Sequence, residues 1–103
     1  MSDAVAGMRV VLPADGLRAR VFDGEAWREG FPLVSLRLAE DEEAYMASHN
    51  ADAVMLKEKW PTAFVSLDGA WHANVPVFRE RRQPDGSVRE VRVTVEAVRE
   101  RKG

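Results

Sequence analysis

Apolar and polar residues alternate over most of the chain, and Asp-Gly pairs cut this strand-like pattern into short segments. The pairs are Asp15-Gly16, Asp23-Gly24, Asp68-Gly69 and Asp85-Gly86. Asp-Gly favours tight hairpin turns, because such turns need a positive φ that glycine adopts freely and aspartate tolerates. We therefore expect a three-stranded meander from residues 8–12, 17–22 and 25–28.

A further alternating segment at 33–38 predicts a fourth strand after a break at Gly30-Phe31-Pro32. After this segment, apolar residues recur at helical spacing instead of at every second position. Acidic residues 40–43 suit the positive end of a helix dipole, and one helical segment is expected at about 41–60, ended by Pro61. Its apolar face would comprise Tyr45, His49, Ala53, Leu56 and Trp60. Asn50 leaves open a split into two short helices, since asparagine is a favoured N-cap.

The C-terminal half predicts a second meander from residues 62–67, 70–82 and 87–99. In its last turn, proline at 84 and glycine at 86 suit a type I turn followed by a bulge, which pairs Gln83 with Ser87. This register places apolar residues opposite each other on one face of the hairpin: Val77 and Val93, Val75 and Val95, Ala73 and Ala97.

The expected fold is α+β, with about seven short, mostly antiparallel strands in two hairpin meanders that form a curved sheet or small open barrel. Residues 1–103 form one domain, with loose tails at 1–6 and 101–103. The two halves resemble each other around Trp27 and Trp71, each after an Asp-Gly pair. We favour shared turn rules over a duplication as the explanation.

Composition narrows the function classes. The 103 residues are 46% hydrophobic and 31% charged, carry a net charge of -2 and include no cysteine. Cysteine-ligated metals, disulfides and thiolate nucleophiles are therefore excluded. The N-terminus lacks the basic start of a signal peptide, and no apolar run approaches the roughly 20 residues of a membrane span. We expect a soluble cytoplasmic protein, or one within a virion or other intracellular assembly, with no membrane contact.

No catalytic, cofactor or metal site is expected. The serines lack a nucleophile-elbow pattern, and the glycines lie singly in turns instead of forming a phosphate-binding loop. Residues 40–43 point around a helix axis and do not converge on one cation. His49 and Asp52 at helical i, i+3 spacing supply only half of a metal site, and His72 is interpreted as a strand residue.

The last hairpin concentrates positive charge. Residues 79–102 contain eight basic and five acidic side chains, whereas residues 1–78 contain seven basic and twelve acidic ones. Arginine and tryptophan are typical anchors of interfaces. The candidate partner-binding residues are Trp27, Phe78, Arg79, Arg81, Arg82, Arg89 and Arg92.

The leading hypothesis is a non-enzymatic protein–protein interaction module, either a small subunit of a larger assembly, such as a virion component, or an inhibitor docking on another protein. A protein partner or self-association is expected. The alternative is nucleic-acid binding through the basic hairpin, against which the interleaved Glu80 and Glu90 argue. A second alternative is a small-ligand or enzymatic site assembled only in the fold.

Overall fold

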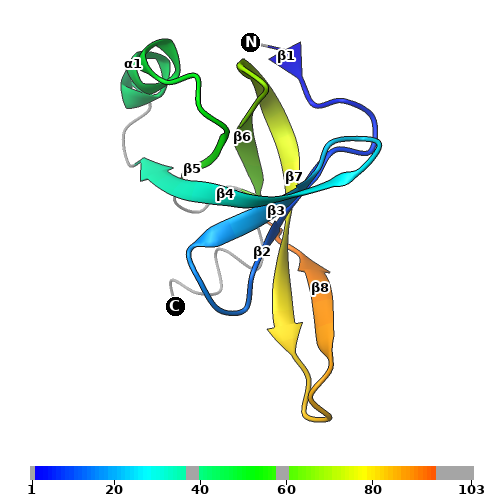
Figure 1. Cartoon of the computed structure of the whole chain (residues 1–103). Helices are drawn as coiled ribbons and strands as arrows, with labels where there is room; N and C mark the ends of the chain where they lie inside the picture. Colours follow the sequence, from blue (N-terminus) through cyan, green and yellow to red (C-terminus); the bar gives the residue numbers. More distant parts are fainter. Residues whose placement is uncertain (1, 37–39, 58–60, 95–103) are drawn as a thin grey trace.

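Each strand alternates apolar and polar residues and so has one apolar side. The sheet curls until these apolar sides face one another in the interior. The computed structural model describes residues 2–36, 40–57 and 61–94 (Figure 1). In these residues the elements are β1 (Ser2–Asp3), β2 (Arg9–Leu12), β3 (Arg18–Phe22), β4 (Trp27–Leu36), α1 (Glu40–Ser48), β5 (Ala53–Lys57), β6 (Thr62–Leu67), β7 (Ala70–Arg82) and β8 (Val88–Arg92). The described residues are rich in strands, as expected, and they include one short helix.

Six strands close into a barrel in the order β2-β3-β4-β5-β6-β7, with β7 pairing back to β2. The expectation of a curved sheet or open barrel is therefore replaced by full closure, which leaves no free edge around the ring. Two of the six pairings, β4 with β5 and β2 with β7, are parallel. The core is lined by Val10, Val21, Val54, Val65, Val75 and Val77, each at most 1% exposed.

The two three-stranded meanders, β2–β4 and β5–β7, have the same pattern of paired residues. The pairs of the first recur 44 positions later in the second, so that Arg18–Pro32 corresponds to Thr62–Pro76 and Ala19–Phe31 to Ala63–Val75. The parallel pairings obey the same offset. Gly30 and Asn74, which correspond, both have a positive φ, 83° and 59°. The resemblance between the halves extends beyond their turns to the whole barrel.

The prediction of one helical segment at about 41–60 is wrong for the second half of that range. The helix α1 covers only Glu40–Ser48, and Ala53–Lys57 is the barrel strand β5. A short apolar run does not distinguish a buried strand from a helix by periodicity alone. Here it pairs on both sides, Val54 with Leu33 and with Val65. Trp60, assigned to the helical face, lies outside the described residues.

The expected break at Gly30-Phe31-Pro32 is also wrong, because β4 runs through it from Trp27 to Leu36 as one strand of 10 residues. The chain stays paired across this segment, with Phe31 opposite Ala19 and Pro32 opposite Arg18. The described residues form eight strands where about seven were expected. Ser2–Asp3, within the tail expected to be loose, pair in parallel with β7.

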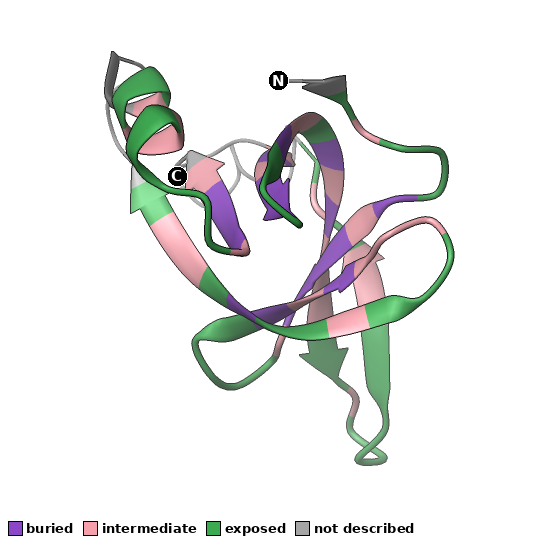
Figure 2. Cartoon of the chain, turned by 45° about the horizontal axis from the view of Figure 1, so that its top comes forward, coloured by how far each residue is buried: buried purple, intermediate pink, exposed green. Residues whose placement is uncertain are grey.

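Strand β7 continues past the barrel and, together with β8, forms a projecting hairpin (Figure 1). In Figure 2 the buried residues gather on the barrel strands, whereas the tip of this hairpin is exposed. The projecting hairpin therefore presents its side chains away from the core.

Candidate functional site

Local turn chemistry builds the β7–β8 hairpin. The Gln83 amide donates to the Ser87 carbonyl at 2.7 Å, and Gly86 supplies the positive φ of 90° that the turn requires. The Asp85 carboxylate accepts the Ser87 hydroxyl at 2.6 Å and its amide at 2.9 Å, which lowers the pKa of Asp85. The resulting register, Arg82 opposite Val88, is the one predicted from the sequence.

Alternation divides the hairpin's side chains between two faces. We call one the glutamate face and the other the arginine face. The glutamate face comprises Phe78, Glu80, Arg82, Val88, Glu90 and Arg92; the arginine face comprises Arg79, Arg81, Arg89 and Val91. The acidic residues that argued against an anion-binding hairpin therefore lie on the opposite side of the ribbon from Arg81 and Arg89.

The two opposed glutamates are compensated by arginines of the barrel. Glu80 lies directly opposite Glu90, an arrangement that is destabilising by itself. Arg20 approaches Glu80 at 3.6 Å and Glu90 at 3.4 Å, and Arg9 approaches Glu90 at 3.9 Å. These ion pairs join β2 and β3 to the hairpin and hold its direction relative to the barrel.

The same arginines cover the aromatic candidates. Arg9 and Arg20 lie 4.9 and 4.7 Å from the centroid of the Trp27 ring, which remains 38% exposed. Arg9 and Arg92 lie 5.5 and 5.7 Å from the half-buried Phe78 ring. Both aromatic side chains are therefore engaged in cation–π contacts that stabilise the network.

Some of the candidate arginines serve the fold. The Arg92 guanidinium donates to the carbonyl oxygens of Pro61, Val77 and Val93 at 2.8, 3.1 and 3.0 Å, and so anchors the base of β8. Arg82 pairs with Asp15 of the β2–β3 loop at 2.8 Å. Planar guanidinium groups suit such multiple contacts.

Arg81 and Arg89 are the candidates that the fold does not engage. They lie directly opposite each other near the tip of the hairpin, and both are exposed. Within residues 2–36, 40–57 and 61–94, neither has a hydrogen-bond or ion-pair partner. Two like charges held opposite each other on a ladder cost stability. The described contacts therefore leave the charges of this pair uncompensated.

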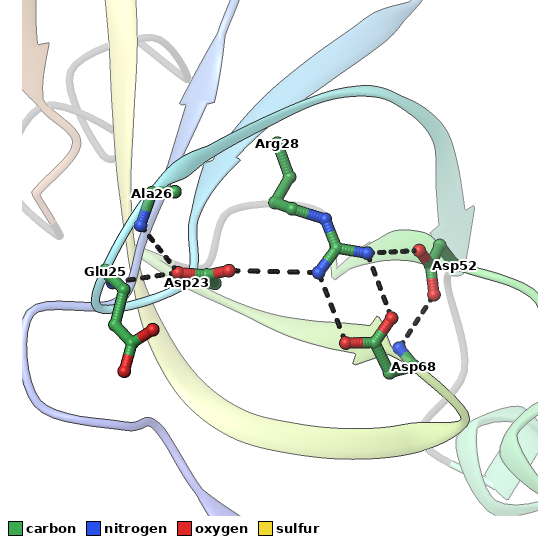
Figure 3. Close-up of polar contacts among 6 residues, drawn as sticks. All are labelled: Asp23, Glu25, Ala26, Arg28, Asp52 and Asp68. Atoms are coloured by element: carbon green, nitrogen blue, oxygen red, sulfur yellow. Dashed lines mark hydrogen bonds and ion pairs between the residues drawn. The ribbon is translucent and has the colours of Figure 1, made fainter.

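A second charged cluster, which sequence reasoning did not find, surrounds Arg28 (Figure 3). Its guanidinium contacts Asp68 at 3.0 Å, Asp52 at 3.2 Å and Asp23 at 3.8 Å. Asp52 also accepts the Asp68 amide at 2.9 Å. One arginine thus ties together the β3–β4 turn, the start of β5 and the β6–β7 turn. Its partners are too far apart in sequence for any local motif to show them.

Hydrogen bonds set the charge state of this cluster. The Arg28 guanidinium lowers the pKa of Asp68, while the backbone amides of Ala26 and Glu25 lower the pKa of Asp23. The Asp68 carboxylate in turn raises the pKa of Arg28. Asp23, Arg28 and Asp68 are therefore ionised at neutral pH, and the cluster acts as a clamp between turns.

His49, His72 and Asp52, which were considered as metal ligands, each contact different partners. His49 stacks on Tyr45 with ring centroids 3.9 Å apart and contacts the Ser48 hydroxyl at 2.8 Å, whereas Asp52 binds Arg28. The structure therefore does not bring His49 and Asp52 together. His72 lies on β7 beside β1, with Nδ1 3.4 Å from the Asp3 carbonyl oxygen.

Comparison with known proteins adds no assignment: no family model, no curated protein and no solved structure matches this chain. None of the helical residues that the structure describes forms a segment long and apolar enough to cross a membrane. Function is therefore inferred from the charges and shape of the described surface.

Proposed function

We propose that the chain is a non-enzymatic protein-binding module that docks on its partner through the β7–β8 hairpin. It would serve as a small subunit of a larger assembly or as an inhibitor of another protein. The observation that carries this proposal is the exposed pair Arg81 and Arg89, which has no compensating partner among the described residues. Acidic side chains on a partner would relieve the repulsion between these two charges.

The hairpin is held ready for docking. Arg20 links both glutamates of the glutamate face to the barrel, so binding does not have to order a mobile ribbon. The β2–β3 loop lies beside it, tied by Arg82 to Asp15, and carries Leu17, whose side chain is 84% exposed.

Nucleic-acid binding is the second candidate, and one observation favours it. The two glutamates that argued against this function point to the face opposite Arg81 and Arg89. An anion approaching the arginine face therefore meets neither Glu80 nor Glu90 there. Against it, Phe78 is covered by Arg9 and Arg92 and is not free to stack on a base.

Photo-crosslinking in the cells that encode the chain separates the two candidates. Val88, 48% exposed at the start of the outer strand β8 with its side chain on the glutamate face, is replaced by p-benzoylphenylalanine, and the matched control carries the same group at Glu43 on the exposed side of α1. A crosslinked species that protease removes and nuclease leaves intact, absent from the control, supports protein docking. A nuclease-sensitive species supports the second candidate, and identical products from both positions contradict any role for the hairpin.

A further inference from the structure

The hairpin also has an open backbone edge. Strand β8 pairs only with β7 among the described residues, and in Figure 1 it forms the outer strand of the projecting hairpin. The bonds from Gln83 to Ser87 and from Val93 to Val77 show that the odd-numbered residues of β8 bond to β7. In an antiparallel ladder the bonding alternates, so the amides and carbonyls of Val88 and Glu90 point outward.

We propose that β8 accepts an extended acidic segment of the partner protein as an added antiparallel strand. This inference rests on the proposed function and specifies how docking occurs. The backbone of an added strand forms hydrogen bonds with the outward amides and carbonyls of β8, and these bonds supply affinity. Every second side chain of the added strand then lies on the same side of the sheet as the arginine face. An acid then stands opposite Arg89, and an apolar residue stands opposite Val91.

Charge favours this occupant over a second copy of the chain. In an antiparallel β8–β8 pairing centred on Arg89, that arginine faces itself, and in one centred on Glu90 the glutamates face each other. A pairing centred on Val91 avoids both but places Arg89 opposite Val93, which leaves the two arginines uncompensated. A strand bearing acids at alternate positions neutralises Arg89 directly, and Arg81 lies one strand spacing, about 4.8 Å, further away.

The test titrates the isotope-labelled chain with the peptide Thr-Val-Thr-Glu-Thr-Glu-Thr, blocked at both ends, and follows the backbone amides by NMR. Antiparallel pairing places its valine opposite Val91 and its first glutamate opposite Arg89. We expect the amide signals of Val88 and Glu90 to shift and their hydrogen exchange to slow at least several-fold. A control peptide with lysine in place of glutamate should produce neither change.

Variants locate the effect on one face. Arg89→Glu should abolish the response, whereas Arg82→Glu, the same charge change on the glutamate face, should retain it. Binding of the peptide without any change at the Val88 and Glu90 amides would overturn strand addition. So would the same changes on simple concentration of the chain, because a second copy would then be the occupant, or on addition of duplex DNA.

The two proposals fail in different ways. A peptide that leaves all signals unmoved while the Val88 crosslink still yields a protein partner contradicts strand addition and leaves protein docking supported. A nuclease-sensitive crosslink contradicts the proposed function itself. A protein crosslink together with the amide changes at Val88 and Glu90 supports both.

Discussion

Replacing Arg20 by methionine is expected to uncouple the hairpin from the barrel. Methionine keeps most of the apolar stem and removes the guanidinium that contacts Glu80 and Glu90 and lies over Trp27. With Arg20 gone, the two opposed glutamates keep the 3.9 Å contact from Arg9 to Glu90 and the hydrogen bond of 3.3 Å that Glu80 accepts from the Ala14 amide. Their repulsion is then largely uncompensated.

The size of the effect follows from the interactions that the Arg20 guanidinium makes. The Arg20 side chain is 34% exposed, so each of its two ion pairs contributes only about 0.5 kcal/mol. The cation–π contact with Trp27 adds about 0.5–1 kcal/mol. Arg20→Met should therefore lower the free energy of unfolding by about 2 kcal/mol, which corresponds to a fall in Tm of roughly 10 °C in a domain of this size.

Urea unfolding of four proteins measures this coupling: the natural chain, Arg20→Met, Glu80→Gln with Glu90→Gln, and all three changes together. In the glutamine background Arg20→Met should cost only the cation–π share, about 1 kcal/mol or less. An equal loss in both backgrounds, or a loss below about 0.5 kcal/mol in the natural chain, would refute the role assigned to the ion pairs.

Three further predictions test other parts of the structure. Arg28→Gln should lower Tm more at pH 7 than at pH 3, because the depressed pKa of Asp68 stabilises the fold above pH 3.8, the usual pKa of the group, and this stabilisation is lost as the pH falls through the lower pKa of the folded chain; an unchanged difference between the two pH values would contradict the clamp. Ser66→Ala should leave stability unchanged or raise it by up to about 1 kcal/mol, since the buried Ser66 hydroxyl has no hydrogen-bond partner among the described residues, and a loss above this size in urea unfolding would show that it has one. Gly30→Asn should be better tolerated than Gly30→Val in thermal unfolding, because Asn74 already adopts the corresponding positive φ in the second meander; equal losses would contradict that equivalence.

Features set by nearby residues could be predicted from the sequence. The register of the β7–β8 hairpin follows from Pro84 and Gly86, and it correctly placed Arg81 opposite Arg89 and Val77 opposite Val93. The strands at 62–67 and 70–82 match the structure for the same reason, since a turn of two residues fixes their pairing.

Features that depend on distant contacts could not be predicted. The strand Ala53–Lys57 was assigned to a helix because its apolar run is compatible with both, and only its pairing with β4 and β6 decides between them. Barrel closure requires β7 to meet β2 in parallel, a pairing that no local pattern encodes. The ion pairs of Arg20 with Glu90 and of Arg28 with Asp68 likewise join residues that only the closed barrel brings together.

The central claim, that the unpaired arginines of the hairpin dock a protein partner, is tested most directly by repeating the Val88 crosslink in two charge-reversed backgrounds. Arg81→Glu with Arg89→Glu should reduce the yield of the protein crosslink at least tenfold, while Arg82→Glu on the opposite face should leave it close to that of the natural chain. Equal yields in all three backgrounds would contradict the account.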